Sequence, residues 1–437
     1  MSDINTHDVS YVRETMLPEQ EPPLTEKGVI KWLRENLFSS YLNTFLTIVS
    51  LYVIYLVLSG ILPWLFNSVW TAPSLNGCRE VLAEKGLTGH SGACFAVLTD
   101  RWQQLLFGFY PQEGYWRPVL ALVVFLVALV PVLFSSAPRG LMWLTAASPV
   151  ILFALLWGGS IWGPIAAMFG FVIGYYAFRF LSEINALAAM LAAIILPIVY
   201  WLFLAGPLAS GLTSILNIGL PYVESKDFGG FTLSIVIGVA GIVLSLPLGI
   251  LLALGRQSDM FIINKFSVAF IEIIRGVPLI VWLFTASLLL NYFLPPGTNF
   301  DLMLRVIIMV TLFSAAYIAE VIRGGLAALP KGQYEGADSL GLNYWQSMRL
   351  IILPQALKIS IPGIVNTFIG LFKDTVLVVF IGLFDPIGLS NAIRASTDWQ
   401  GIYWELFVFI GVIFFIFCFS MGRYSLYLEK KLQREHR

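Results

Sequence analysis

Ten apolar runs, each about as long as a membrane-spanning helix, constrain this chain more than any other feature. A helix needs about 20 mostly apolar residues to cross the hydrocarbon core of a bilayer. Hydrophobic residues make up 58% of the 437 residues and charged residues only 12%, so polar groups are too few to cover a soluble domain of this size. The candidate spans are 42–65, 118–135, 140–158, 160–179, 185–205, 231–255, 267–293, 302–325, 356–384 and 402–422.

The sequence therefore predicts an all-α polytopic membrane protein with about ten transmembrane helices. Only Gly158–Ser160 separate the third run from the fourth, which predicts a tight hairpin and makes eight spans the alternative count. A stretch rich in Gly and Pro at 206–230 punctuates the chain and predicts a periplasmic loop. This loop divides an N-terminal transmembrane extension, 42–205, from a C-terminal core of five helices, 231–425.

Lys and Arg residues near the ends of the spans predict the orientation, since they accumulate on the cytoplasmic side of a membrane. Lys27, Lys31 and Arg34 precede the first span. Ten alternating spans then place both termini inside, together with the loop 326–355 and the basic tail 426–437. In the N-terminal tail, 1–41, the amphipathic stretch from Lys27 to Ser40 favours a helix lying in the membrane interface. An ordinary polar lead-in is the alternative.

Two of the three cysteines, Cys78 and Cys94, share a polar loop at about 67–117 that this orientation places outside. The space outside the inner membrane of a Gram-negative cell is oxidising, which favours a disulfide that closes the loop. Two free thiols are the alternative, because the sequence does not show whether the sulfur atoms meet. Cys418, in the last apolar run, is most simply a packing residue.

Residue types that catalysis or metal binding require are scarce. His7, His90 and His436 are the only histidines, and no two have the spacing of zinc ligands. No G-x-x-x-x-G-K-[ST] loop occurs, so the sequence has no recognisable ATP site, and its net charge of zero argues against a nucleic-acid partner. We expect no catalytic site, metal or cofactor in this chain, so energy, if the protein uses any, must come from a partner or an ion gradient.

The predicted cytoplasmic loop between the eighth and ninth runs is patterned as two short helices. Gly341 separates them, because glycine tolerates the backbone of a sharp turn, and Pro354 suits the start of the next helix. The apolar and aromatic residues between its charges are Tyr334, Leu340, Leu342, Tyr344, Trp345 and Met348. An elbow with an exposed apolar ridge indicates a docking surface.

This loop resembles the EAA motif of ABC importer permeases, which reads E-A-A, three residues, G, nine residues and I-x-L-P. The matching residues are Glu335, Gly336, Ala337, Gly341, Ile351, Leu353 and Pro354. Every spacing agrees, and Gly336 stands where alanine is usual. The resemblance implies that the loop receives the motion of a separate ATPase, which binds ATP and Mg²⁺ and hydrolyses the nucleotide.

The resemblance extends to the stretch 270–279, which is similar to the E-x-x-R-G-x-P-L stretch of permeases for polar amino acids. The long N-terminal extension is similar to that of general L-amino-acid permease subunits. The resemblance implies an importer of L-amino acids with broad, or polar and acidic, specificity. The implied partners are an ABC ATPase dimer, a second homologous permease subunit, a periplasmic amino-acid-binding protein and membrane lipids. The alternative function is an ion-coupled secondary transporter of amino acids or other small polar solutes.

Two pairs of charged residues lie near the predicted inside ends of their spans. Glu272 and Arg275, and likewise Glu320 and Arg323, are three residues apart and so share a helical face. We interpret each pair as a helix-end salt bridge that positions the docking loop, in preference to a substrate-binding role.

Lys373 and Asp374 interrupt the ninth apolar run. Charges within a membrane face the protein interior or a watery cavity, and an amino acid carries one ammonium and one carboxylate, so this pair is a candidate for the translocation pathway. A mutually neutralised pair, or one at the outer boundary, is the alternative. A helix that begins near Pro362 places the pair midway across the membrane, and one that begins near Pro354 places it nearer the outer face.

Overall fold

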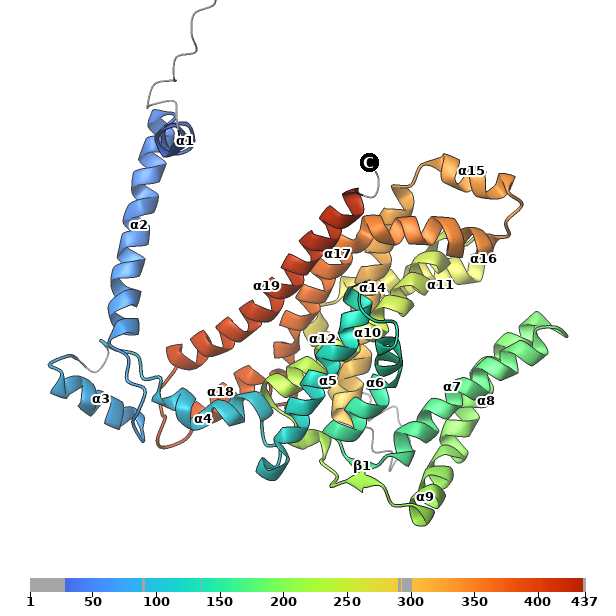
Figure 1. The fold of residues 1–437 in the computed structure, drawn as a ribbon, viewed down its shortest axis with the longest axis horizontal. Helices are drawn as coiled ribbons and strands as arrows, with labels where there is room; N and C mark the ends of the chain where they lie inside the picture. The colour runs from blue at the N-terminus through green and yellow to red at the C-terminus, as the bar shows by residue number, and fades with distance from the viewer. Residues whose placement is uncertain (1–27, 89–90, 135, 290–291, 293–300, 435–437) are drawn as a thin grey trace, which may run out of the picture. The chain divides into compact units, whose positions relative to one another are not determined.

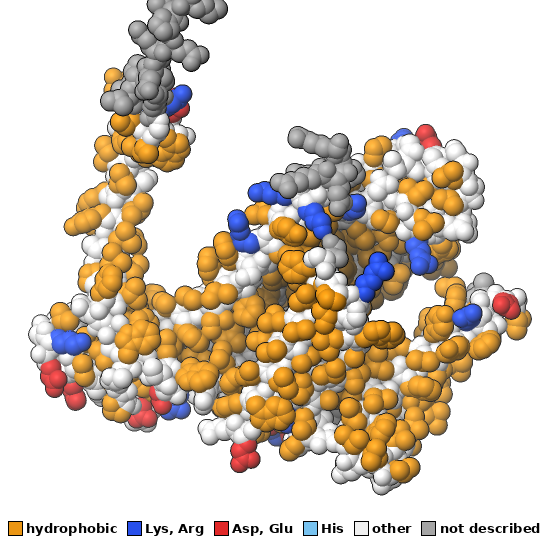
Figure 2. All heavy atoms as spheres, in the orientation of Figure 1, with side chains coloured by type: hydrophobic (Ala, Val, Ile, Leu, Met, Phe, Trp, Pro, Cys, Tyr) orange, Lys and Arg blue, Asp and Glu red, His pale blue; other side chains and the backbone are white. Residues whose placement is uncertain are grey.

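The computed structural model describes residues 28–88, 91–134, 136–289, 292 and 301–434. It shows an all-α polytopic membrane protein (Figure 1), with one antiparallel pair of two-residue strands, β1 (Gly159–Ser160) and β2 (Gly219–Leu220), among these residues. Seven helices of the described chain are long and apolar enough to cross a membrane, or up to nine if each of two bent helix pairs is a single span. Hydrophobic side chains cover most of the visible helical surface (Figure 2), as a lipid-facing protein requires.

The ten predicted runs all coincide with helices, but they do not all form full spans. The single spans are built on α2 (Tyr41–Phe66), α5 (Trp116–Leu133), α7 (Trp162–Leu181), α10 (Gly230–Gln257), α14 (Leu302–Ala327), α17 (Leu353–Asp374) and α19 (Trp404–Arg434). The bent pairs are α8 (Ala186–Phe203) with α9 (Ala205–Ile215), at 51°, and α11 (Phe261–Gly276) with α12 (Leu279–Phe284) and η4 (Thr285–Leu289), at 102°. The remaining run forms α6 (Leu141–Leu156), which at about 24 Å is shorter than the bilayer core.

Shorter elements join these helices. They are α1 (Gly28–Asn36), α3 (Leu75–Glu84), α4 (Ala96–Phe107), η2 (Gln112–Gly114), η3 (Ser225–Asp227), α15 (Lys331–Ser339), α16 (Tyr344–Ser347), η5 (Met348–Ile352), η6 (Thr375–Ile381) and α18 (Pro386–Arg394).

The prediction of one continuous span over 267–293 was wrong. Helix α11 begins earlier, at Phe261, and ends at Gly276, and α12 then leaves at a bend of 102°. Proline disfavours helical backbone in the residue before it and has no N–H to donate. Val277 accordingly has extended backbone, with φ −119° and ψ 134°, directly before Pro278.

The predicted hairpin between the third and fourth runs is only partly present. Gly158 and Gly159 have φ values of 69° and 72°, and a Cβ atom at Gly158 would lie 2.2 Å from the carbonyl oxygen of Pro221, so the turn is tight. The two helices that it joins nevertheless find other partners. Helix α6 packs mainly against α5, and α7 packs mainly against α8.

The chain forms two compact units, one comprising residues up to Val69 with Arg79–Ala93 and the other comprising Trp70–Cys78 with Cys94–Arg437. The predicted N-terminal extension is therefore divided between units. In the first unit, α2 contains no buried residue, and Figure 1 shows α1 almost end-on at the N-terminal end of α2. A helix that crosses the end of a membrane span is the arrangement expected of a helix in the membrane interface. The interfacial location of α1 itself stays a prediction.

Helix α14 is the centre of the second unit, packing against α10, α11, α12 and α17. Glycines permit its close approach to neighbours, because a Cβ atom at Gly249 of α10 would lie 2.6 Å from the side chain of Ile318. Its two halves belong to two buried apolar clusters. One cluster contains Met303, Val306 and Val310, and the other contains Ile318, Ile322 and Leu326.

A buried arginine joins α5 to the chain that follows α6. Arg117, in the first turn of α5, donates from Nε to the carbonyl oxygen of Leu155 at 2.7 Å and from Nη1 to that of Pro221 at 2.8 Å. Helix C-termini leave carbonyl groups without partners inside the helix, and a guanidinium satisfies several of them at once. This contact anchors α5, α6 and the segment after β2 to one another.

Asp385 begins α18 and is fully buried. Its carboxylate accepts hydrogen bonds from the backbone N–H groups of Ile387 at 3.1 Å and Gly388 at 2.9 Å, as an N-cap residue does. Burial raises the pKa of Asp385 from 3.8 to about 6, and backbone hydrogen bonds, including those from Gly388 and Ile387, limit that rise. The folded protein thus binds a proton at Asp385 more tightly than the unfolded chain does.

We predict that the Asp385 carboxyl makes the protein less stable as pH rises above about 4 and through about 6, because the folded state must then ionise a buried group. Asp385→Asn keeps an acceptor and carries no charge, so the stability loss of the wild type between about pH 5 and pH 7, on the order of 1–2 kcal/mol, should disappear. Asp385→Ala should lose about 1 kcal/mol or more at both pH values with the cap. Thermal unfolding in detergent measures these differences, and equal pH slopes for wild type and Asp385→Asn would contradict the prediction.

Candidate functional site

The segment from Lys331 to Ile352 forms an elbow at one end of the second unit (Figure 1). Helix α15 ends before Gly341, whose φ of 68° reverses the chain. Helix α16 then starts with a capping box, in which Asn343 and Gln346 each accept a hydrogen bond from the other residue's backbone N–H. We call this segment the docking elbow.

One side of the docking elbow is buried against the core. Met348 and Ile352 belong to an apolar cluster with Ile318 and Ile322 of α14, and Ala337 of α15 is buried too. The elbow also continues through the π-helical turn η5 into α17, so that the chain is helical from Tyr344 into the membrane span. The docking elbow is therefore attached to the core by apolar packing and by a continuous helix.

The other side of the docking elbow is an exposed apolar surface. Leu340, Tyr344 and Trp345 are 72%, 49% and 67% exposed, and Leu350 lies beside them along the chain and is exposed too. The prediction that Met348 belongs to this exposed ridge was wrong, because its side chain faces the buried cluster. Exposed aromatic and aliphatic side chains outside the lipid-facing helices are unusual unless something covers them.

The residues of the motif fall on both sides. Glu335, Gly336 and Gly341 are exposed, Ala337 is buried, Ile351 and Leu353 are partly buried, and Pro354 is exposed in the first turn of α17. Gln333 and Gln355 add a side-chain hydrogen bond of 2.9 Å between α15 and α17. The motif residues thus form and attach the docking elbow, while the exposed apolar side chains lie between them in sequence.

We predict that Gly336→Ala stabilises α15. Gly336 lies inside the helix, and a Cβ atom there would meet no atom within 4 Å. Alanine in place of an interior glycine is worth about 0.5–1 kcal/mol of helix stability. Amide hydrogen exchange of α15 should therefore slow in Gly336→Ala, whereas Gly341→Ala, at a positive φ, should speed it. Faster exchange in Gly336→Ala would contradict the free space around this residue.

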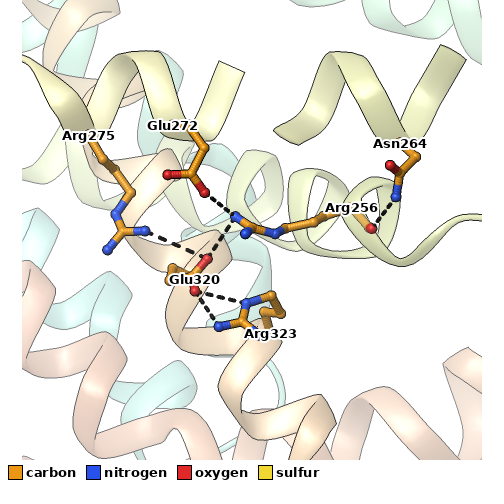
Figure 3. A network of polar contacts seen from close by, with 6 residues as sticks. All are labelled: Arg256, Asn264, Glu272, Arg275, Glu320 and Arg323. Carbon is orange, nitrogen blue, oxygen red and sulfur yellow. Dashed lines mark hydrogen bonds and ion pairs between the residues drawn. The ribbon is translucent and has the colours of Figure 1, made fainter. Parts of the chain in front are cut away.

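Behind the docking elbow, five charged side chains form a network at the ends of three helices (Figure 3). Nη1 of Arg256, from α10, lies 2.9 Å from Oε1 of Glu272 on α11 and 3.0 Å from Oε2 of Glu320 on α14. Nη1 of Arg275 lies 3.7 Å from the same oxygen of Glu320, and Arg323 donates to its other oxygen. Glu320 is therefore the common partner of three arginines.

The sequence predicted two separate pairs, and the structure corrects one of them. Glu320 and Arg323 are paired, but Glu272 is bonded to Arg256 while Arg275 lies near Glu320. The reason is that the last turn of α10 brings a guanidinium from a third helix between the two carboxylates. Asn264 holds that turn, donating to the carbonyl oxygen of Arg256 at 2.6 Å. Local spacing along α11 and α14 contains no information about α10.

We predict that Glu320→Gln destabilises the protein more than Glu272→Gln does. Glu320 is 22% exposed and neutralises several arginines, whereas Glu272 is 55% exposed and has one partner in the network. The expected losses in free energy of unfolding are about 1–2 kcal/mol for Glu320→Gln and below about 1 kcal/mol for Glu272→Gln. Thermal unfolding at low and high salt provides the measurement, and the reverse order would show that Glu320 is not the centre of the network.

Lys373 and Asp374 lie in the last turn of α17. This helix begins at Leu353, which places the pair about 30 Å along the helix, far from the docking elbow. Lys373 is exposed and Asp374 is partly buried. Of the two predicted starting points of this helix, Pro362 and Pro354, the structure agrees with the one near Pro354. The role of the pair in a translocation pathway stays a prediction.

The remaining predicted residues are placed as follows. A disulfide joins Cys78 and Cys94, with a Cα–Cα distance of 5.9 Å, and Cys418 is free. His7, His90 and His436 lie outside the described residues. Within the described residues, no group of three or more His, Cys, Asp or Glu side chains could hold a metal ion.

Comparison with known proteins identifies the family. The model of the family described as "Binding-protein-dependent transport system inner membrane component" matches residues 245–434. The "Glutamate/glutamine/aspartate/asparagine transport system permease protein BztC" of Rhodobacter capsulatus is 56% identical over 98% of this chain and 100% of its own length. The "Inner membrane amino-acid ABC transporter permease protein YhdY" of Escherichia coli K12 is 40% identical over 92% of each chain.

A shorter relative, the "Glutamate/aspartate import permease protein GltK" of Escherichia coli O157:H7, is 30% identical over 48% of this chain and 94% of its own length. The fold and these relatives define the class as a multi-spanning subunit of a transporter in the inner membrane. The chain belongs to the family of amino-acid ABC transporter permeases. These relatives give no support to the alternative function, an ion-coupled secondary transporter.

Proposed function

We propose that this chain is the permease subunit of an importer for polar and acidic L-amino acids, and that a separate ATPase gates it through the docking elbow. The observation that carries the gating proposal is the two-sided character of the elbow. Ala337 and Ile352 are buried in the core while Leu340 and Trp345 are exposed. A partner that binds the exposed side can therefore move the helices that contain the buried side.

The transmission follows from the attachments of the elbow. A displacement of α16 acts directly on α17, because the helix is continuous, and it acts on α14 through Ile352 and its apolar neighbours. ATP binding by the partner needs to favour one arrangement of these helices by only a few kcal/mol to change which side is open. In this proposal ATP and Mg²⁺ belong entirely to the partner chain.

The proposed assembly comprises an ATPase dimer, a second homologous permease subunit, a periplasmic amino-acid-binding protein and the surrounding lipids. We place the docking elbow and both termini in the cytoplasm. The charge distribution supports this orientation, since Arg423, Lys430 and Lys431 lie near the end of α19 and Figure 2 shows Lys and Arg side chains around that end and the docking elbow. The opposite end of the unit then faces the periplasm.

The substrate proposal rests on the relative BztC, whose name states glutamate, glutamine, aspartate and asparagine. The test is reconstitution of the chain in proteoliposomes with its ATPase, second permease and binding protein. We expect these four amino acids to stimulate ATP hydrolysis and to accumulate inside. A flat response across all the common amino acids would overturn the substrate class and leave the family unchanged.

We predict that Trp345→Ala weakens binding of the ATPase. An exposed tryptophan at the centre of a docking surface typically contributes about 2 kcal/mol, or roughly thirty-fold in Kd. Trp102→Ala is the matched control, because Trp102 is also exposed but lies on α4, which we place on the periplasmic side. Copurification and titration of the ATPase against both variants in nanodiscs provide the measurement. Equal affinity of Trp345→Ala and wild type would show that the docking elbow is not part of the ATPase interface.

A further inference from the structure

The segment Cys94–Tyr110 lies outside the region that the family model matches, yet it is packed into the core. We call it the α4 brace, because α4 is its main element. Residues Cys94–Val97 are buried, and α4 packs against α10, α18 and α19. A loop between membrane helices ordinarily lies on the surface, so the burial of this one calls for a physical reason.

The α4 brace is attached at one end to the start of α19. The backbone N–H of Cys94 donates to Oε1 of Glu405 at 2.9 Å, and Glu405 is only 7% exposed in the first turn of α19. The fully buried Trp399 donates from its indole Nε1 to the carboxylate of Asp100 at 2.8 Å. Buried carboxylates and indole groups need such partners, so separation of the two segments would leave polar groups unsatisfied.

The other end of the α4 brace is attached to the start of α10. The hydroxyl of Thr232 donates to the carbonyl oxygen of Leu106 at 2.9 Å. A Cβ atom at Gly108 would lie 2.3 Å from Cα of Gly229, and one at Gly230 would lie 2.1 Å from the carbonyl oxygen of Leu105. The two backbones therefore touch directly, with no side chains between them that could adjust to a relative movement.

The disulfide fixes the first attachment. It joins Cys94, the residue that donates to Glu405, to Cys78 of α3. A covalent crosslink restricts the conformations that a loop can adopt when its non-covalent contacts open. The N–H of Cys94 is thus held where Glu405 can accept it.

We infer that the α4 brace makes the starts of α10 and α19 move as one rigid body during transport, with Glu405 as the positioning residue that joins them. The inference rests on the proposed function, which requires these helix ends to take part in opening and closing on the periplasmic side. It extends that function by stating which helix ends stay together. Opening on the periplasmic side then takes place between this rigid body and other helices. Binding of the loaded binding protein on that side acts on α10 and α19 together.

Distance measurement between spin labels tests the rigid body. Lys226→Cys, before α10, and Gln400→Cys, before α19, are both exposed, and Cys418→Ser removes the free thiol of the described chain. In the complete transporter in nanodiscs, we expect one narrow distance distribution that is the same without nucleotide and with ATP. Glu405→Ala, and separately Cys78→Ala with Cys94→Ala, should broaden it. A distance that changes with nucleotide in the otherwise unsubstituted brace would overturn the inference.

ATP hydrolysis tests the link to transport. We expect Glu405→Ala to keep the basal ATPase rate of the complex. The stimulation of that rate by loaded binding protein should fall about five- to ten-fold. Glu405→Gln, whose amide oxygen can still accept from Cys94, should restore that stimulation. Gln103→Ala, at an exposed position of α4, is the matched control and should behave as wild type.

The outcomes separate this inference from the proposed function. If the unsubstituted transporter itself shows no stimulation by any amino acid, the proposed function fails, and the label distances still decide whether the helix ends move together. If Glu405→Ala lowers the unfolding temperature but keeps full stimulation, the α4 brace is only a stabilising contact and the inference is overturned. If Glu405→Gln fails to restore stimulation, Glu405 does not act through the N–H of Cys94 and the inference is likewise overturned.

Discussion

The close packing of α14 against α10 and α17 is the contact on which the second unit depends. It is made possible by glycines at the crossing points, since a Cβ atom at Gly249 or Gly363 would lie 2.6 Å from the nearest side-chain atom of Ile318 or Val321. Without water to drive helices together, membrane helices gain stability from such close van der Waals contact. The apolar cluster behind the docking elbow and the charged network around Glu320 both form on the surface of α14 that this packing positions.

Several charged groups of the second unit are stabilised by the backbone instead of by an opposite charge. Arg117 donates to carbonyl groups at the end of α6, Asp385 accepts from the first N–H groups of α18, and Glu405 accepts from Cys94. Each lies where a helix begins or ends, since unpaired backbone groups are available there. Such contacts connect different segments of the chain, whereas the Glu320 network connects side chains of three helices at the opposite end of the unit.

Regular features of the sequence predicted a large part of this structure. The apolar runs located the helices because a membrane span needs a long uninterrupted apolar stretch, and Gly341 marked the turn of the elbow because few other residues adopt a positive φ. Gly276 and Pro278 also indicate the bend after α11, because proline interrupts a helix, but the apolar run continues past them and so predicted a single span. By contrast, no spacing rule could show that Met348 faces inward or that Arg256 joins Glu272 to Glu320, because both depend on which helices are neighbours.

The sequence by itself determined that the chain is a helical membrane protein, that it belongs with the ABC permeases, and that a turn between two short helices lies between Glu335 and Pro354. These features are local, and each depends on residue type and spacing along one stretch of chain. Tertiary structure alone decided which side of the elbow is exposed, which arginine reaches which glutamate, and that Cys94 and Glu405, far apart in sequence, meet at the start of α19. The physical reason is that burial and hydrogen bonding between helices depend on their packing, which local patterns do not encode.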